Sequence, residues 1–304
     1  MPVKAIEGAK RLSRRARRPD VVAARIRVGE NVVSILNLGD LSFRLRDVER
    51  APESEWRPRY GELFDKRLRF PSQSVHVSTR DASILVDAGD YALFASVDPS
   101  YIPENYTPPS NLVAQLAEIG VRRNDVTHVV ITHAHYDHYA GVTTKTEAGY
   151  LPTFPHARHL LGKADWENPE MQKAIGERGS AEMLTLGALE ASGLIDLVDG
   201  ERRLTPEVAV LAAPGESPGH QIVRVHSGGK TLYCLGDLFH HAIEVEDINL
   251  MASWCDALAN KKSRLQLIRA ALSEDAALVA AHMPPGRLAG STENPRFLAI
   301  GNSS

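Results

Sequence analysis

The segment HAHYDH at 133–138 constrains this chain more than any other feature, and it follows directly after the apolar run at 127–132. In an extended chain, side chains at positions i and i+2 point to the same side, so His133 and His135 can direct two imidazoles at one metal ion. Asp137 and His138 follow at a turn and can face a second ion nearby. Packed together without a metal, these side chains would leave several polar groups unsatisfied. The segment therefore predicts a site for divalent ions such as Zn²⁺, Fe²⁺, Mn²⁺ or Co²⁺.

Three further residues of metal-ligand type stand just beyond the ends of expected strands. His220 lies in a sharp turn after the run at 208–212, Asp237 follows the run at 231–235, and His282 follows the run at 277–281. Strand ends within one region of a sheet converge in space, and α/β folds build their sites there. Together with HAHYDH, these three residues supply a complete ligand set.

Short apolar runs typical of strands alternate with helical periodicities along the chain. We expect strands at 32–36, 41–45, 75–79, 83–86, 127–132, 208–212, 222–225, 231–235 and 277–281, the first two forming a hairpin around Gly39 and Asp40. Helices are expected at 110–120, capped by Ser110, and at 180–192 and 263–272. This order fits an α/β sandwich of two mixed sheets with helices outside.

The length of 304 residues and an apolar content of 43% fit a single layered α/β unit. The first 18 residues carry seven lysines and arginines against one glutamate, and no apolar stretch follows them. We therefore expect a basic N-terminal arm over 1–24 rather than a secretory signal, and one domain over 25–304.

Charge and cysteine usage narrow the partners and the compartment. A net charge of −3 gives no general attraction to nucleic acid or to an anionic membrane, and no apolar run approaches the roughly 20 residues that span a bilayer. We expect neither as a partner. Cys234 and Cys255 form no CxxC pair, which predicts two buried free thiols in a reducing compartment such as the cytoplasm.

Five ordered features of the chain resemble the motifs of the metallo-β-lactamase superfamily over residues 30–290. They are Asp87 after a strand, HAHYDH, PGH with His220, GD with Asp237, and AH with His282. The resemblance implies an αββα sandwich with a site for two divalent metal ions, zinc ahead of iron, manganese or cobalt, at the sheet edge. It implies that His133, His135 and His220 bind the first metal, that Asp137, His138 and His282 bind the second, that Asp237 bridges both, and that Asp87 orients a ligand histidine or the motif loop.

Details of the motifs favour one branch of the superfamily. Asp237 in place of a cysteine is unlike the common β-lactam hydrolysing enzymes, and HxHxDH is unlike the HxExD pattern of the oxygen-reducing diiron branch. The segments at 154–158, 165–167 and 236–241 resemble the branch that holds N-acyl homoserine lactonases and organophosphate hydrolases. Many of those lactonases carry a tyrosine three residues after the bridging aspartate, where this chain has His240. That departure leaves the identity of the substrate open, and a homodimer, known in this branch, also stays open.

The resemblance implies a metal-dependent hydrolase of the lactonase or esterase type, acting on a small-molecule ester or lactone. Two metals would lower the pKa of a shared water, which would attack the ester or lactone carbonyl. Asp137 or Asp237 can move the proton to the leaving oxygen, and His240 can stabilise the developing oxyanion or be a simple surface histidine.

Other assignments stay open on the sequence alone. The alternative substrates are a phosphotriester, an aryl ester or a glyoxalase-type thioester, and the alternative proteins are a single-iron thiol dioxygenase and a non-enzymatic binding scaffold. Phe239, Trp254 and the loop at 101–106 are candidates for the pocket wall or for the core. The remaining histidines are expected to be structural or solvated, and they are His76, His128, His156, His159, His226 and His241.

Overall fold

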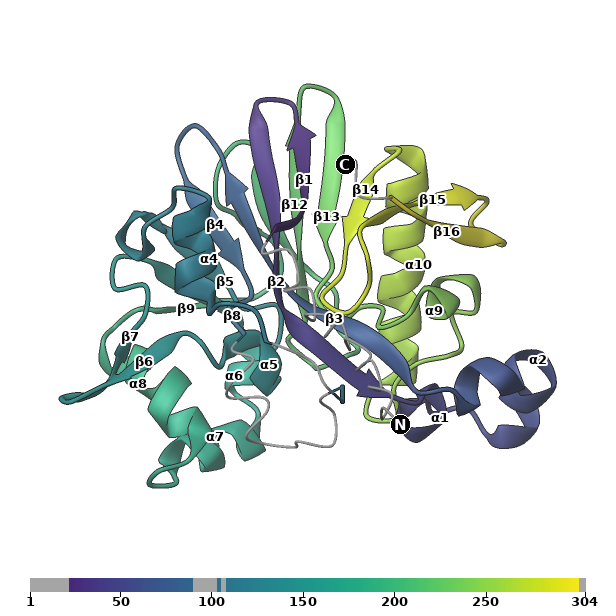
Figure 1. Cartoon of the computed structure of the whole chain (residues 1–304), viewed down its shortest axis with the longest axis horizontal. Helices are drawn as coiled ribbons and strands as arrows, with labels where there is room; N and C mark the ends of the chain where they lie inside the picture. The colour runs from purple at the N-terminus through teal and green to yellow at the C-terminus, as the bar shows by residue number, and fades with distance from the viewer. Residues whose placement is uncertain (1–21, 90–102, 105–107, 301–304) are drawn as a thin grey trace, which may run out of the picture.

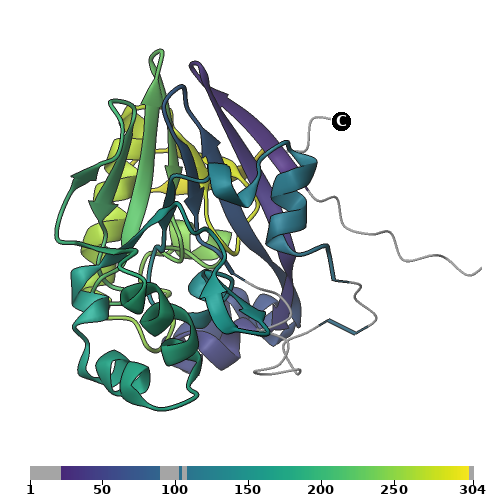
Figure 2. The same ribbon diagram turned by 90° about the vertical axis from the view of Figure 1, so that its left-hand side faces the viewer.

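Two seven-stranded sheets lie face to face in the computed structural model, which describes residues 22–89, 103–104 and 108–300. Figure 1 shows the two sheets side by side, and Figure 2 shows them splayed open toward one end. Residues 1–21 of the expected basic arm lie outside the described residues. The first strand starts at Val22, so residues 22–24 belong to the sheet and not to the arm.

The first sheet has the strand order β1-β2-β3-β4-β5-β8-β9, with parallel pairing from β4 to β5, β8 and β9. Its strands are β1 (Val22–Val28), β2 (Asn31–Phe43), β3 (Leu68–Ser78), β4 (Ser83–Val86), β5 (His128–Val130), β8 (Arg158–Gly162) and β9 (Ile195–Val198). A separate hairpin is formed by β6 (Thr143–Thr146) and β7 (Gly149–Pro152).

The second sheet keeps its strands in sequence order from β10 to β16, and only β13 and β14 pair in parallel. Its strands are β10 (Arg202–Arg203), β11 (Val208–Ala212), β12 (Gln221–Ser227), β13 (Lys230–Cys234), β14 (Ala277–Val279), β15 (Gly286–Gly290) and β16 (Pro295–Ala299). The strands expected at 222–225 and 231–235 are confirmed as β12 and β13, which pair as an antiparallel hairpin.

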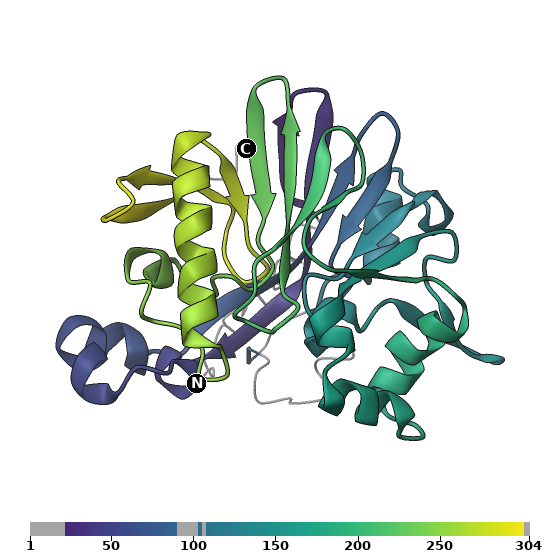
Figure 3. The same ribbon diagram turned by 180° about the vertical axis from the view of Figure 1, so that it is seen from behind.

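Helices cover the outer faces of both sheets, which confirms the predicted sandwich of mixed sheets flanked by helices (Figures 2 and 3). The helices are α1 (Leu45–Val48), α2 (Glu53–Asp65), α4 (Leu112–Glu118), α5 (Tyr136–Tyr139), α6 (Lys163–Trp166), α7 (Pro169–Gly176), α8 (Ala188–Ala191), α9 (Ala242–Glu246) and α10 (Ala257–Ser273), with a 3₁₀ turn η2 (Arg123–Asp125) and a π-helical turn η3 (Met183–Gly187). None of the helices in the described part of the chain is long and apolar enough to cross a bilayer.

Three buried apolar layers hold this arrangement together. Between the sheets lies a valine-rich layer that includes Val33, Val77 and Val223. Leu116 of α4 packs on the outer face of the first sheet, and Ile268 of α10 packs on the outer face of the second. Burial of such side chains stabilises the fold by about 1.5–3 kcal/mol each. Cys234 and Cys255 are buried free thiols, as predicted.

The expected early hairpin is wrong, because residues 31–43 form the single long strand β2. Asn37 Oδ1 accepts a hydrogen bond from the N–H of Gly39, and the register against β3 shifts between these two residues. Gly39 has φ 143°, so a glycine here produces a bulge that bends the strand instead of a turn that ends it. Past this bulge β2 continues through Leu41 to Phe43, still paired with β3.

Two of the expected helices also differ in detail. The cap of α4 is Asn111, whose Oδ1 accepts a hydrogen bond from Ala114 N–H, rather than Ser110. The expected helix at 180–192 contains the π-helical turn η3 before α8. The helix expected at 263–272 begins earlier in the chain than its apolar periodicity indicates, because Asp256 is the N-cap of α10. The Asp256 side chain accepts hydrogen bonds from the N–H groups of Leu258 and Ala259.

Two buried glutamines join the sheets where their strands end. Gln73 of β3 donates from Nε2 to the carbonyls of Ala280 and Met283, at 2.8 and 2.7 Å. Gln221 of β12 donates from Nε2 to the carbonyl of Ile131 at 2.8 Å. Each glutamine therefore ties one sheet to a loop of the other, and the loops beyond β5 and β14 are held in a fixed relation.

Gly162, at the end of β8, permits a close backbone approach that sets the turn after β11. A Cβ atom on Gly162 would lie 1.9 Å from the carbonyl oxygen of Gly219. We expect Gly162→Ala to lower the free energy of unfolding by about 1–3 kcal/mol, because the turn must shift to relieve the clash. Urea unfolding followed by circular dichroism measures the change.

Gly176→Ala is the matched control. Gly176 is the last residue of α7, and a Cβ atom there would have no heavy atom within 4 Å. The same substitution should then be neutral or stabilising by up to about 1 kcal/mol, because alanine favours the helix. Equal destabilisation of both variants would contradict the role given to Gly162.

Candidate metal centre

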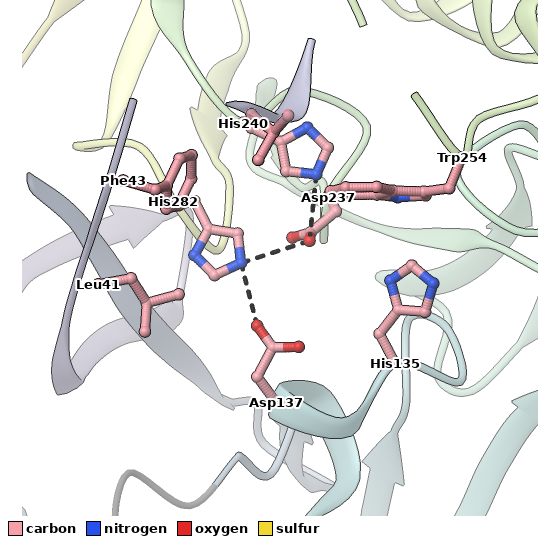
Figure 4. A pocket seen from close by; sticks show the side chains of 9 residues that line it. Leu41, Phe43, His135, Asp137, Asp237, His240, Trp254 and His282 are labelled. Atoms are coloured by element: carbon pink, nitrogen blue, oxygen red, sulfur yellow. Dashed lines mark ion pairs between the residues drawn. The ribbon is translucent and has the colours of Figure 1, made fainter. Parts of the chain in front are cut away.

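The predicted motif residues meet at the end of the sandwich where the parallel strands terminate. β4, β5 and β8 of the first sheet and β13 and β14 of the second end in loops that face one another. His135, Asp137, Asp237, His240 and His282 line one pocket there (Figure 4). The strand-end rule that predicted their proximity therefore holds for these loops.

A change of backbone conformation within HAHYDH aims its side chains in two directions. His135 is extended, with φ −93° and ψ 148°, and is the N-cap of α5. His133 and His135 thus precede the helix, whereas Asp137 and His138 lie in its first turn. The rings of His133 and His135 converge, with Nε2 of the first 2.8 Å from Nδ1 of the second.

One group of ligand atoms gathers around Asp137, His138, Asp237 and His282. Asp237 Oδ2 lies 3.3 Å from both His138 Nε2 and His282 Nε2. Asp137 Oδ2 lies 3.5 Å from His138 Nε2 and 3.2 Å from His282 Nε2. Figure 4 shows His282 facing both carboxylates. The four residues that the sequence assigned to the second metal and to the bridge therefore surround one point.

A second group contains His133 and His135 together with Glu216, a residue that the sequence did not single out. Glu216 Oε1 lies 3.4 Å from His135 Nδ1. Asp237 Oδ2 also reaches toward this group, at 3.9 Å from His133 Nε2. Asp237 therefore lies between the two groups, in the place expected of a bridging carboxylate.

His220 is buried near the second group but is not part of it. Its ring centroid lies 5.2 Å from that of His133. Its Nδ1 lies 3.0 Å from the carbonyl oxygen of Ala213, and its Nε2 accepts a hydrogen bond from the N–H of Asp237 at 3.2 Å. In this structure both ring nitrogens of His220 are thus engaged by the backbone.

Two buried aspartates hold the motif loop from behind. Asp87 has φ 60°, a conformation that aspartate tolerates better than most residues, and accepts hydrogen bonds from the N–H and Oγ1 of Thr132. Its Oδ2 also lies 3.0 Å from His138 Nδ1. It therefore contacts both the motif loop and one of its histidines.

Asp165, at the start of α6, joins the motif loop to the turn that bears Glu216. Its Oδ2 accepts hydrogen bonds from Ala134 N–H and Ser217 Oγ, at 3.0 and 2.7 Å. Its Oδ1 accepts from Gly219 N–H at 2.6 Å. The carboxylate therefore sets the distance between two loops that are more than 80 residues apart in the chain.

His240 enters the site from beyond Asp237. Its Nε2 lies 3.5 Å from Asp237 Oδ2 and 3.6 Å from Glu216 Oε1. On its other side, Nδ1 lies 3.4 Å from Glu244 Oε1, and Glu244 is itself paired with the fully buried Arg264. The ring of His240 is thus oriented by a buried carboxylate and directed into the pocket.

The buried carboxylates of the site need positive charge close by to compensate their own negative charge. Burial alone would raise the pKa of Asp237, but His282 and His138 outweigh it and hold that pKa well below its usual range. Conversely, burial would lower the pKa of His282, but Asp237 and Asp137 raise it to about 10. Burial and the neighbouring rings of His138 and His135 hold the pKa of His133 well below normal. Divalent ions can supply the positive charge that protons supply otherwise.

The spacing of the ligand atoms fits metal ions. Ligand atoms about 2.1 Å from a tetrahedral ion lie about 3.4 Å apart. The measured separations within the two groups are 2.8–3.9 Å. Among the described residues, His138 Nε2 and Asp237 Oδ1 are also buried without a hydrogen-bond partner. These two atoms are therefore free to bind a ligand.

The pocket above these groups has a volume of about 210 Å³. Leu41 and Phe43 form an apolar wall on one side, and Trp254 lies on another (Figure 4). Val48 adds a further apolar lining residue. Phe239 is a core residue instead, fully buried with the Arg264 guanidinium over its ring. The loop at 101–106 lies outside the described residues except for 103–104.

The remaining histidines stay apart from both groups. His156 and His226 are exposed, and His76 is buried with Nε2 2.8 Å from Ser83 Oγ. His241 caps α9 by accepting a hydrogen bond from Ile243 N–H. Within the described chain, none of these rings, nor those of His128 and His159, joins a candidate ligand group.

Sequence reasoning missed Glu216 and the linking role of Asp165. Glu216 is a ligand-type residue just after β11, so the strand-end rule that selected His220 applied to it equally. It also lies four residues from His220 in the same turn. Only the path of that turn decides which of the two side chains faces the two groups of ligand residues. The signal was present, but the sequence did not distinguish the two residues.

Known proteins share both the sequence and the architecture in part. The chain is 26% identical over 183 residues to a probable metallo-hydrolase of Mycobacterium tuberculosis, with 54% of this chain and 56% of the relative covered. It is 22% identical over 168 residues to an N-acyl homoserine lactonase of Bacillus cereus, with 53% and 60% covered. The chain thus spans little more than half the length of these curated relatives.

A solved structure extends the likeness to most of the chain. AidC, a dizinc quorum-quenching lactonase in complex with the product N-hexanoyl-L-homoserine, superposes with a TM-score of 0.72 at 20% identity, covering 92% of this chain and 98% of AidC. The shared architecture is the metallo-β-lactamase fold. Residues 67–282, more than half of the 304, match the description Metallo-beta-lactamase superfamily. The chain therefore belongs to the metallo-β-lactamase superfamily.

Proposed function

We propose that this protein is a binuclear metal-dependent hydrolase that opens small lactones or cleaves small esters. One observation carries the proposal. Asp237 belongs to the ligand group of Asp137, His138 and His282, and its Oδ2 also lies 3.9 Å from His133 Nε2 of the second group, at the base of a pocket with an apolar wall. The shared carboxylate supports two adjacent ions over the single iron of a thiol dioxygenase, and the intact ligand groups argue against a non-enzymatic scaffold.

The residues divide between two metal positions. Asp137, His138 and His282 would hold one ion, His133 and His135 would contribute to the other, and Asp237 would contact both. Nitrogen and carboxylate ligands suit zinc, with iron, manganese or cobalt as alternatives. Such ions, when bound, lower the pKa of a water molecule toward neutrality and polarise the carbonyl under attack.

Asp137 is the best placed residue to move a proton. It lines the pocket, and His138 and His282 hold its pKa well below the usual range against the effect of burial. Its carboxylate is therefore charged at neutral pH and can accept the proton of the attacking water. It can then pass that proton to the alkoxide that leaves as the ester bond breaks. Asp237 has the same chemistry but is surrounded by four imidazoles.

His240 would stabilise the developing oxyanion. Burial would lower its pKa, but Glu216 and Glu244 outweigh this effect and raise it well above the ordinary value. The ring is thus protonated at neutral pH, and its Nε2 faces the pocket. A cationic donor beside the carbonyl would stabilise the negative charge that forms on it. This role replaces the tyrosine that many related lactonases carry at this position.

The pocket wall favours a small substrate with one apolar side. A volume of about 210 Å³ is below the range of about 300–1,000 Å³ usual for drug-sized ligands. Leu41, Phe43 and Val48 would contact an alkyl or acyl group while the ester carbonyl faces Asp137 and His240. The lactonases among the relatives support a lactone ring over a phosphotriester centre.

The ligand assignment predicts a joint loss of metal and activity. Asp237→Ala and His135→Ala should each bind fewer than two metal ions per chain and lose turnover by about 1,000-fold or more. Elemental analysis after gel filtration and hydrolysis of a lactone measure the two effects. Unchanged turnover in both variants would rule out the two-metal proposal.

The pocket predicts an order of substrates. We expect the highest kcat/KM for small γ- and δ-lactones, lower values for aryl esters, and the lowest for a paraoxon-like phosphotriester and a glutathione thioester. The reason is that the planar ester carbonyl fits between the apolar wall and His240. A preference for the phosphotriester would favour the phosphotriesterase alternative.

The role of His240 predicts a rate effect without metal loss. His240→Ala should lower kcat/KM for a lactone by roughly 100–1,000-fold, the usual effect of removing one oxyanion donor, while two metal ions stay bound. His156→Ala is the control, because His156 is exposed and lies outside the pocket. If His240→Ala lost a metal ion, His240 would be a ligand and not an oxyanion donor.

A further inference from the structure

We infer that Glu216, and not His220, completes the first metal position beside His133, His135 and Asp237. The inference rests on the proposed binuclear function and changes the donor set of that centre. Its first support is distance. Glu216 Oε1 lies 3.4 Å from His135 Nδ1, whereas His220 belongs to none of the ligand groups in the described residues.

The Glu216 carboxylate is fixed in place by two neighbours. Trp254 Nε1–H donates to its Oε1, and Cys255 Sγ–H donates to its Oε2 at 2.9 Å. The side chain is fully buried, and burial of a carboxylate is costly unless it is paired or binds a metal. A ligand held by such outer contacts is oriented before the ion arrives.

His220 has no lone pair left for an ion in this arrangement. A carbonyl oxygen only accepts, so Nδ1 must donate to Ala213, and a backbone N–H only donates, so Nε2 must accept from Asp237. This pattern defines one neutral tautomer with both nitrogens engaged. We therefore assign His220 as a positioning residue that holds the backbone of Asp237.

With Glu216 in place of His220 as a ligand, both metal positions have the same donor set. Each position then has two imidazoles, one carboxylate of its own, and a share of Asp237. Glu216 would bind only the ion at the first position, and Asp137 would bind only the ion at the second. Carboxylate oxygen is a harder donor than imidazole nitrogen, so manganese or iron should compete with zinc better here than at a three-histidine position.

Cobalt binding to the metal-free full-length protein tests the assignment. We expect two Co²⁺ ions per chain for the unaltered protein, with visible absorption bands for both positions. Glu216→Ala should weaken binding at one position by about 100-fold or more, whereas His220→Gln, which keeps a donor and an acceptor, should still bind two ions. Elemental analysis after gel filtration gives the stoichiometry.

The outcomes separate this inference from the proposed function. Fewer than two Co²⁺ ions in the unaltered protein would refute the binuclear function. Two ions in the unaltered protein and in Glu216→Ala, with one in His220→Gln, would overturn the assignment of Glu216. Thermal unfolding by circular dichroism identifies a misfolded variant, in which case Glu216→Gln, equal in size but uncharged, replaces Glu216→Ala in the same comparison.

A change of metal preference provides a second readout. Glu216→His restores the three-histidine set, so its preference for Zn²⁺ over Mn²⁺ in competitive binding should rise by about tenfold or more relative to the unaltered protein. His156→Ala, which alters an exposed residue outside the pocket, is the control and should leave the ratio unchanged. An unchanged ratio in Glu216→His would contradict direct contact between Glu216 and the ion.

Discussion

The Asp237 carboxylate is the constraint on which the rest of the site depends. Its Oδ2 lies within 3.9 Å of the Nε2 atoms of His133, His138, His240 and His282. These imidazoles come from three separate segments of the chain, and a buried carboxylate costs several kcal/mol unless such partners compensate it. The loops that carry them must therefore be held at fixed distances from one another.

The sandwich supplies that fixed geometry through its strand ends and a few buried polar links. Parallel pairing of β13 with β14 places the loop of Asp237 beside that of His282, and Ala281 N–H donates to the Gly236 carbonyl between them. Gln73 and Gln221 then tie each sheet to the other. Because these amide groups are buried, loss of any of these bonds would leave unsatisfied polar atoms, which favours one relative position of the sheets.

Much of this arrangement could be predicted from the sequence because it depends on local geometry. The i, i+2 spacing of His133 and His135 fixes their common direction in extended chain, and Asp237 and His282 follow strands that are recognisable by their apolar runs. The apolar wall could not be predicted in this way. Leu41 and Phe43 reach the pocket only because the bulge at Gly39 lets β2 continue, and a glycine there is equally compatible with a turn.

The choice between Glu216 and His220 shows where local reasoning ends. Asp165 accepts hydrogen bonds from Ser217 and Gly219 of the same turn and so fixes the path of that turn, although it lies some 50 residues earlier in the chain. The resulting carboxylate adds a negative charge that a three-histidine set would not have. His240, 3.6 Å from Glu216, is well placed to offset it, since Glu216 and Glu244 keep that ring protonated against the effect of burial. With Glu216 as the ligand that we propose, the carboxylate at 216 and the histidine at 240 would be linked departures from the family pattern. Each would offset the charge of the other in a buried site.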